Sequence, residues 1–359
     1  MAEYRVTGLS PDVIAELVAE LEPVWHEQHQ ARLTARPWQR AVGAGAKHKF
    51  VFIDRLLATL VSLRHGTTHD VLACWFGVDR STITRAIGEV RPPLAQRGCT
   101  VAQGIRLRTL GEVIEYLGAD GTGIIDGTEV RVRRPAVGRN GRDEIVSGKT
   151  KQNAVKTLVV TDAEGRVLFC SPVWPGSFAD ITQARQLGLA QLPADGAILE
   201  ILADAGYQGM GAQTGGHVLT PPHRKFKKNA PAWYEERHEQ QREAHSSRRI
   251  RVEHGIAHLK NWRALARHLG RREHMSDIVQ AIAALLSHQQ TATRGHSLHS
   301  SIALDVPPPT LHEVVSCDVL GAVTGTASHE EAQPRTPRAC REALRGKSVE
   351  DGNSPLPQC

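Results

Sequence analysis

The sequence has few aromatic residues: Phe, Trp and Tyr together make up only 4% of its 359 residues. Hydrophobic residues of all kinds make up 40%, which is enough to form a packed core. The length allows two domains of ordinary size, because domains most often contain about 100–150 residues. We therefore expect a globular chain despite the shortage of aromatic side chains.

Paired cysteines are also lacking, since the six cysteines are scattered and none forms a Cys-x-x-Cys motif. This spacing argues against a zinc ribbon and against a disulfide scaffold. It fits a protein of the reducing cytoplasm. The six residues are Cys74, Cys99, Cys170, Cys317, Cys340 and Cys359.

The sequence contains no candidate membrane-spanning or secretory segment. No apolar run approaches the roughly 18 residues that a spanning helix requires. The N-terminus carries Glu3, Asp12 and Glu16, and it has no basic region followed by an apolar run, so it does not resemble a signal peptide. A cytoplasmic protein with no membrane partner is the expectation.

The positive charge of the chain is concentrated in one segment. The formal net charge is +6 overall, with a pI near 9.1. Residues 221–272 alone contain fourteen Lys/Arg and five Asp/Glu, a net charge of +9, so the rest of the chain is slightly acidic. A concentrated basic stretch is the electrostatic signature expected of a protein that binds nucleic acid.

Composition and periodicity divide the chain into five regions. Residues 1–46 are expected to form a helix from Pro11 to about Gln30, which Pro23 could kink or end early, followed by a basic connector. Residues 47–98 are predicted to be a compact helical domain, 99–120 a linker, and 121–294 a mixed α/β domain. Residues 295–359 are rich in Ser, Pro, Thr and Gly and are expected to be a mostly disordered tail.

The helical domain has the pattern of a helix-turn-helix. Helices are predicted over 52–63, 68–76 and 80–90, with a turn at 77–79 and a stop at Pro92-Pro93. On the third helix Ile83, Ala86 and Ile87 would face the core. The polar residues that would face outward toward DNA are Arg80, Ser81, Thr82, Thr84 and Arg85. The alternative is an ordinary three-helix unit that binds nothing.

The α/β domain is predicted to contain a mixed sheet flanked by helices. Strands are expected over 123–132, 153–161, 166–173, 198–203 and 217–220, the second and third forming a hairpin. Helices are expected over 179–192 and over 230–269, the latter possibly broken near Ser246-Ser247.

Three carboxylates of this domain stand out by position. Asp126 lies inside an apolar strand, Asp204 ends another strand, and Glu253 lies on the late helix. A charged group in an apolar strand is costly to bury unless it binds a cation or a partner. Two strand carboxylates and one helix carboxylate can hold two hard divalent ions about 4 Å apart. Asp180 could be a fourth acid, but we favour a first-turn acid stabilised by the dipole of its helix.

Cations surround these acids in the sequence. Arg249, Glu253 and Lys260 share one face of the late helix, because offsets of four and seven residues nearly complete whole turns. The acid could bind a metal while the cations grip a phosphate backbone; the alternative is a surface helix with i,i+4 ion pairs. Further basic residues predicted to contact DNA are Lys149, Lys151, Arg224, Lys225, Lys227 and Lys228.

The order of these motifs resembles that of bacterial insertion-sequence transposases of the DDE superfamily, in the branch related to the Harbinger-type nucleases. The helix-turn-helix is followed by IIDGTEV, SGKTKQNAVK, LADAGYQG and RRIRVEHGIAHLKNWR, over about residues 40–290. The family's Tyr-x2-Arg-x3-Glu-x6-Lys signature matches at Arg249, Glu253 and Lys260. Ser246 stands in place of the Tyr, and Asn153 stands where a His is usual.

The resemblance implies a ribonuclease H-like catalytic core with Asp126, Asp204 and Glu253 as its catalytic, metal-binding triad. Two Mg²⁺ ions, replaceable by Mn²⁺, would be held, with Asp126 bridging both and Glu253 completing the coordination shell of the second ion. Double-stranded DNA, as terminal inverted repeats and target, is the implied partner, and a homodimer assembled on DNA in the nucleoid is expected. The alternatives are a domesticated nuclease without strand transfer and a non-catalytic DNA-binding regulator.

Overall fold

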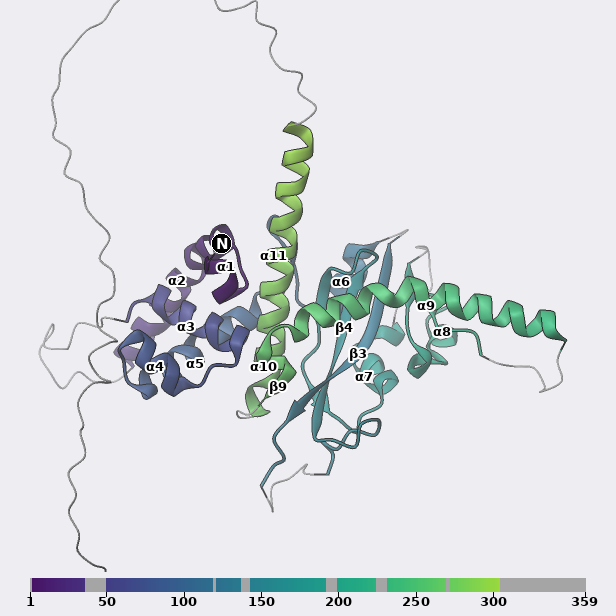
Figure 1. The fold of residues 1–359 in the computed structure, drawn as a ribbon, viewed down its shortest axis with the longest axis horizontal. Coiled ribbons are helices and arrows are strands. Elements are labelled where there is room, and N and C mark those ends of the chain that lie inside the picture. The colour runs from purple at the N-terminus through teal and green to yellow at the C-terminus, as the bar shows by residue number, and fades with distance from the viewer. Residues whose placement is uncertain are drawn as a thin grey trace, which may run out of the picture. The chain divides into compact units, whose positions relative to one another are not determined.

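The structure is a computed structural model, shown in Figure 1. It describes residues 2–35, 50–118, 121–136, 143–191, 199–223, 231–268 and 272–303. The described residues belong to one compact unit. Four of the predicted DNA contacts, Arg224, Lys225, Lys227 and Lys228, lie outside the described residues, as does the predicted tail from residue 304 onward.

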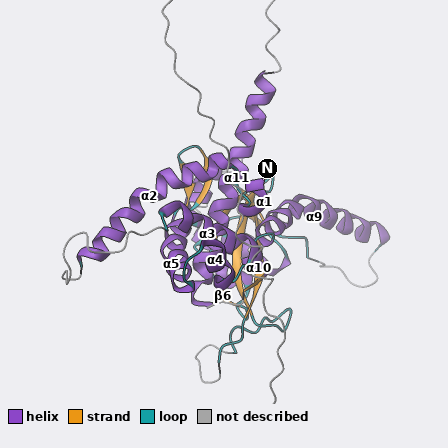
Figure 2. Cartoon of the chain, turned by 60° about the vertical axis from the view of Figure 1, so that its left-hand side comes forward, coloured by secondary structure: helices purple, strands orange, loops and turns teal. Residues whose placement is uncertain are grey.

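Helices alone build the N-terminal part of the described chain (Figure 2). Ser10 caps the second of them by accepting a hydrogen bond from the Val13 amide through its hydroxyl, at 3.4 Å. That helix continues through Pro23, one of the two outcomes that the sequence left open. The bounds are α1 Ala2–Thr7, α2 Pro11–Thr34, α3 Phe52–His65, α4 His69–Phe76 and α5 Arg80–Gln96.

The third helix of the helix-turn-helix is longer than predicted. The expectation that Pro92-Pro93 ends it was wrong, because α5 continues to Gln96. Each proline removes one backbone donor but has a φ that suits a helix. Val90 and Leu94 are fully buried on either side of the prolines, in the same apolar cluster as α11 (Met275–Ala303). Their burial compensates for the lost hydrogen bonds.

A mixed sheet forms the centre of the second part of the chain. Its order is β5-β4-β3-β7-β8, in which β3, β4 and β5 run antiparallel while β7 and β8 run parallel to β3. This arrangement confirms the predicted ribonuclease H-like core. The bounds are β3 Thr122–Val132, β4 Ala154–Asp162, β5 Val167–Cys170, β7 Glu200–Leu202 and β8 Val218–Leu219, with β6 Trp174–Pro175 beside β4 and β9 Arg267–His268 beside β3.

Helices cover both faces of this sheet because its strands are apolar on both sides. Ile124 and Val130 of β3 pack in one cluster with α9 and α11, whereas Ile125 packs in a second cluster with α6, α7 and α8. Figure 1 shows α9 crossing β4 and β3. The helix bounds are α6 Leu110–Leu117, α7 Asp180–Gln186, α8 Met210–Gln213, α9 Ala232–Lys260 and α10 Arg263–Ala266, with short turns η1 Leu189–Gln191, η2 Ala205–Tyr207 and η3 Arg272–His274.

Residues 99–120, expected to be a linker, contain regular structure. They form a hairpin of β1 (Cys99–Ala102) and β2 (Ile105–Leu107), followed by α6. Thr109 and Glu112 close a capping box at the start of α6. Strands of three and four residues are too short for a periodicity argument, and this explains why the sequence analysis missed them.

The two longest helices depart from the predicted boundaries. α9 runs for 29 residues without a break at Ser246-Ser247, and it ends at Lys260 rather than at 269. α11 also has 29 residues and passes the predicted start of the tail at 295 by several residues. Among the described residues, no helix is long and apolar enough to span a membrane.

Side chains of α11 hold backbone groups from several other elements. Gln289 Oε1 accepts a hydrogen bond from the Ser10 amide at 2.7 Å, and Gln290 Oε1 accepts one from the Val167 amide at 3.1 Å. Ser287 Oγ accepts another from the Thr100 amide at 2.9 Å. α11 therefore fastens the start of α2, the hairpin and the edge of the sheet to one another.

Gly255 is predicted to be necessary where α9 packs on the sheet. A Cβ at this position would lie 2.8 Å from Thr161 Cγ2 and 3.2 Å from the Gly165 carbonyl oxygen. We expect Gly255→Ala to lower the free energy of unfolding by about 1–3 kcal/mol, despite the higher helix propensity of alanine. Urea denaturation of the full chain measures the change.

Gly88 in α5 is the matched control, because a Cβ there would meet nothing within 4 Å. Gly88→Ala should stabilise the protein by about 0.5–1 kcal/mol through helix propensity. Equal stabilisation by both substitutions would contradict the close packing of α9 at Gly255.

Candidate active site

The parallel pairing of β3 and β7 brings two predicted acids together. Thr122 is paired with Glu200 and Ile124 with Leu202. Two residues further along this register, Asp126 lies beside Asp204. The charge of Asp204 is one of the causes that raise the pKa of Asp126, which agrees with this proximity. The structure therefore places two of the three predicted acids at the carboxyl end of β7.

Asp204 is held by its own turn. Its Oδ1 accepts a hydrogen bond from the Gly206 amide at 2.8 Å, and this contact caps the short helical turn η2. The remaining acceptor positions of this carboxylate are not used by that contact, so an ionised Asp204 can also bind a cation.

Asp126 is a partly buried carboxylate in an unfavourable electrostatic position. Its side chain is 22% exposed, and its Oδ1 accepts a hydrogen bond from the Gly127 amide at 2.8 Å. Burial raises the pKa of Asp126 to about 6; the cation of Arg249 opposes this shift, while the charges of Asp204 and Asp180 add to it. A positive charge added next to Asp126 would therefore stabilise the folded protein.

Arg249 lies against Asp126 from helix α9. Its Nη2 is 3.3 Å from Asp126 Oδ2, and its side chain is 13% exposed. The Nε of the same guanidinium is buried and has no hydrogen-bond partner among the described residues. A buried donor without a partner is costly. Arg249 thus contacts an acid directly, in addition to the phosphate contact predicted for it.

Glu253 follows Arg249 by one turn on the same face of α9 and is exposed. Two contacts fix α9 along this edge of the sheet: His245 Nε2 lies 2.9 Å from the Ala203 carbonyl oxygen, and Arg248 forms a bidentate ion pair with Glu200. Lys260 is also exposed, two turns beyond Glu253. The predicted Arg-Glu-Lys face therefore exists on one continuous helix.

The arrangement fits hard divalent ions only in part. Among the described residues, no group of three or more His, Cys, Asp or Glu is placed to hold a metal ion. Glu253 does not complete a three-acid site with Asp126 and Asp204. Mg²⁺, however, usually binds through one or two carboxylates and keeps several waters or substrate phosphate oxygens. The side-by-side aspartates, with the raised pKa of Asp126, meet that requirement.

Asp180 lies near Asp126, although from the sequence we favoured a role for it only as a first-turn acid of its helix. It is the first residue of α7, as expected of a first-turn acid. Its charge also raises the pKa of Asp126, and its Oδ1 lies 3.2 Å from Lys156 Nζ. Gly127, directly after Asp126, lies next to Asp180, since a Cβ there would lie 2.9 Å from Asp180 Oδ1. No signal in the sequence links these two residues.

The basic loop after β3 is anchored to that strand by Glu129. Ser147 Oγ donates to Glu129 Oε1 at 2.6 Å, and Thr150 Oγ1 donates to Oε2 at 3.0 Å. Lys149 and Lys151 are exposed, and Lys151 adopts a left-handed φ of 56°. A non-glycine residue in that region is uncommon and is found at functional sites.

The third helix of the helix-turn-helix has the predicted faces. Ile83, Ala86 and Ile87 are buried. Thr84 is engaged within the domain, since its hydroxyl lies 2.8 Å from His69 Nδ1 and donates to the Arg80 carbonyl at 3.0 Å. The outward residues are Arg80, Ser81, Thr84 and Arg85, which are exposed, and Thr82, which is half-buried.

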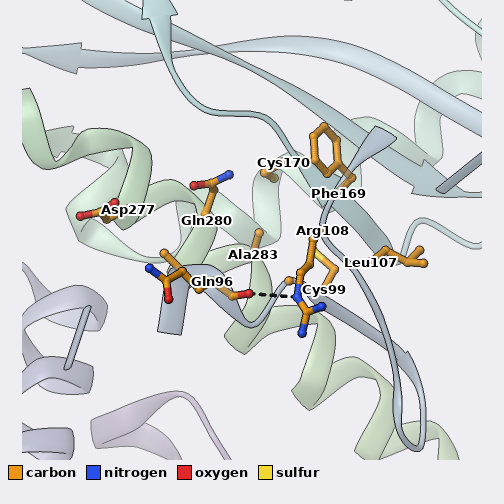
Figure 3. Close-up of a pocket in the computed structure, with 11 residues that line it drawn as sticks. Gln96, Cys99, Leu107, Arg108, Phe169, Cys170, Asp277, Gln280 and Ala283 are labelled. Carbon is orange, nitrogen blue, oxygen red and sulfur yellow. Dashed lines mark hydrogen bonds between the residues drawn. The ribbon is translucent and has the colours of Figure 1, made fainter. Parts of the chain in front are cut away.

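A pocket elsewhere in the fold lacks the features of a catalytic site (Figure 3). It lies between the end of α5, the hairpin, β5 and α11. Arg108 Nε donates a hydrogen bond to the Gln96 carbonyl oxygen at 3.2 Å. Its two thiols, Cys99 and Cys170, are buried, and burial raises the pKa of Cys99 to about 12. A thiol that stays protonated is a poor nucleophile and a poor metal ligand.

Comparison with known proteins defines the class. Residues 48–100 match a family described as the helix-turn-helix of DDE superfamily endonuclease, and residues 125–287 match the DDE superfamily endonuclease family. A relative from Streptomyces albus G, named as a candidate transposase for insertion sequence element IS112, is 30% identical over 264 residues, which are 72% of this chain and 83% of that protein. The chain therefore belongs to the insertion-sequence transposases of the DDE superfamily with an N-terminal helix-turn-helix. No solved structure matches it.

Asp126→Asn is expected to stabilise the metal-free protein at neutral pH. Because the folded pKa of about 6 lies above the unfolded value of 3.8, the contribution of Asp126 to stability is most favourable below pH 4 and is lost as the pH rises through 6. Removing the charge should raise the free energy of unfolding at pH 7.5 by roughly 2–3 kcal/mol. Urea denaturation with EDTA at pH 4 and pH 7.5 measures both values.

The pH dependence separates this effect from a general change in packing. Below pH 4 the wild-type carboxyl is also neutral, so the two proteins should then have nearly equal stability. The same stabilisation at both pH values would indicate a general change in packing, whereas a loss of stability at pH 7.5 would show that Arg249 neutralises Asp126 more fully than the raised pKa implies.

Proposed function

We propose that this protein is a transposase that binds the ends of its element and then cleaves and joins DNA strands with divalent metal ions. The observation that supports the proposal is the pairing of β3 with β7, from whose register Asp126 lies beside Asp204, together with the contact of Arg249 with Asp126. The family membership gives the reaction class, and the acid pair gives the place where it would occur.

In this proposal Asp126 and Asp204 hold the metal ions, and Glu253 contributes from α9 once DNA is bound. Bound Mg²⁺ would lower the pKa of the attacking hydroxyl or water and stabilise the leaving oxygen. Arg249 and Lys260 bind phosphates of the cleaved strand, and Lys149 and Lys151 bind phosphates further along it. No protein nucleophile is needed, so no covalent protein–DNA intermediate is expected.

DNA recognition is assigned to α5. Its exposed Ser81 and Arg85 lie on the opposite side from the buried Ile83 and Ile87, so the helix can enter a major groove without disturbing its core. Arg80 is 3.4 Å from Asp70 in an exposed ion pair, which DNA phosphates can replace at little cost. Joining two element ends calls for two active sites, so we propose a homodimer on DNA.

Asp204→Asn is expected to abolish cleavage while leaving sequence-specific binding intact. The substitution preserves the shape and the Gly206 amide contact but removes a metal-binding charge. Cleavage of a labelled duplex carrying the element's own ends, with Mg²⁺ and then with EDTA, measures one activity, and gel shift with the same duplex measures the other. Cleavage by the variant at the wild-type rate would contradict the assignment of Asp204.

The same assay tests Glu253 against a matched control on α9. Glu253→Gln should reduce the rate of cleavage by at least the roughly 100-fold typical of a lost charge-stabilising group. Glu243→Gln, which changes an exposed acid of the same helix, should leave the rate unchanged.

The wild-type protein in the same assay distinguishes the alternative functions. Specific binding without any Mg²⁺- or Mn²⁺-dependent cut would favour a non-catalytic DNA-binding regulator. Cuts without joined products would favour the nuclease.

Arg85→Ala should weaken specific DNA binding without unfolding the domain, because Arg85 is exposed. Loss of one phosphate contact should reduce the slope of log affinity against log salt by about one; loss of a base contact should instead relax specificity at one position. Gel shifts at several salt concentrations distinguish the two. Unchanged affinity and slope would remove Arg85 from the interface.

A further inference from the structure

We infer that Thr84 of α5 recognises a thymine in the element ends through its methyl group, and that His69 of α4 is the residue that positions it. This inference rests on the proposed function, because it requires α5 to enter the major groove of the DNA. It goes beyond that function by naming the base and the chemical group that the helix recognises. The place of Thr84 on α5 and the hydrogen bonds that join it to His69 support the inference.

Thr84 lies on the exposed stripe of α5. The residues of this stripe recur at intervals of three and four and so share one face of the helix: Ser81, Thr84, Arg85 and Gly88. Thr84 is little more than one turn from the start of the helix at Arg80. In a recognition helix the N-terminal residues are the ones that contact base edges. The position of Thr84 therefore suits a contact with a base.

The hydroxyl of Thr84 is already used inside the domain. Its Oγ1 donates to the Arg80 carbonyl oxygen at 3.0 Å and lies 2.8 Å from His69 Nδ1. A threonine hydroxyl has a single proton. Whether that proton goes to the Arg80 carbonyl or to the His69 ring, it stays within the protein. Thr84 therefore has no proton left to donate to a phosphate or to a base.

The methyl group is the part of Thr84 that remains for DNA. Because Oγ1 points toward His69 and the backbone of α5, the exposed part of this side chain is Cγ2. In the major groove of unmodified DNA, thymine is the base that carries a methyl group, and a threonine methyl is one of its usual contacts. Contact between the two methyl groups removes both from water and distinguishes thymine from cytosine, which lacks this group.

His69 determines which of its two γ groups Thr84 turns outward. In a helix threonine divides between two χ1 rotamers, since Oγ1 can bond to the carbonyls of the preceding turn. His69, the first residue of α4, supplies a second partner for Oγ1 and so favours one of them. Burial, and then the charge of Arg80, lower the pKa of His69, so the ring is neutral at pH 7.5 and does not attract a phosphate itself. His69 is thus a positioning residue that acts through Thr84.

The experiment measures the affinity of the full-length protein for a synthetic duplex of the element's own end, in which uracil replaces one thymine at a time. Uracil pairs as thymine does but lacks the methyl group, and the duplex contains no methylated cytosine, so a loss of affinity identifies a thymine methyl. We expect the wild type to lose about three- to fivefold in affinity at one thymine, the effect of one methyl-sized group that is no longer buried. Gel shifts at a fixed salt concentration measure the loss.

Two substitutions of Thr84 separate its methyl group from its hydroxyl. Thr84→Ser keeps the hydroxyl and removes the methyl, so the effect of uracil at that thymine should disappear. Thr84→Val keeps the methyl and removes the hydroxyl, so the effect should remain. Ser81→Ala, almost one turn earlier on the same stripe, is the matched control and should leave the effect of uracil at that thymine unchanged.

The role of His69 is tested by rescue. His69→Ala should reduce the effect of uracil at the same thymine, because Thr84 then also adopts its other rotamer. Valine carries methyl groups in both γ positions, so Thr84→Val in the His69→Ala chain should restore the full effect. A residue that served only the folding of α4 would give no such rescue, and its absence would overturn the role of His69.

The outcomes separate this inference from the proposed function. If the wild type binds the end specifically but uracil has no effect at any thymine, the inference is overturned and the proposed function stands. An effect that persists in Thr84→Ser, or one that is lost in Thr84→Val, would also overturn the inference, because another group would then make the contact. Absence of any sequence-specific binding by the wild type would overturn both. Thermal melting of each variant, followed by circular dichroism, excludes unfolding as the cause.

Discussion

The parallel pairing of β3 with β7 is the constraint on which the rest of the site depends. Three backbone pairs, from Thr122 with Glu200 to Ile124 with Leu202, fix the register. A shift by one residue would turn Asp126 and Asp204 to opposite faces, because side chains alternate along a strand. The cores on both faces of the sheet hold this register, since Ile124 and Ile125 pack into different clusters.

That register has an energetic consequence. It places like charges next to one another in a partly buried position, and the only cation in contact with Asp126 among the described residues is Arg249 of α9. Without a bound cation the arrangement opposes folding, so the apolar packing elsewhere must exceed this cost. Functional sites in proteins commonly trade local stability for function in this way.

The sequence predicted the parts of the molecule in which a local pattern has one physical meaning. Asp126 within an apolar strand, the buried face of Ile83 and Ile87, and the continuous face from Arg249 to Lys260 were all readable without a structure. The N-terminal helix-turn-helix and the mixed sheet are as expected, and the comparisons with known proteins agree with both.

The features that the sequence analysis missed depend on distant contacts. The prolines of α5 are tolerated because α11, almost two hundred residues later, shares the apolar cluster of Leu94. Asp180 comes near Asp126 only through the tertiary fold. In the sequence, the role of a first-turn acid at the start of a helix explains Asp180 equally well. Short elements such as β1 and β2 leave too few residues for any periodicity.

The contacts of α11 limit how this protein can be recombined with its relatives. Gln289 and Gln290 are neighbours in sequence, yet one binds the start of α2 and the other binds the edge strand of the sheet. A chimera that takes the DNA-binding helices from one transposase and the sheet from another would therefore split a shared structural element. Exchange of the N-terminal helices in evolution or in the laboratory would have to include compensating changes in the C-terminal helix.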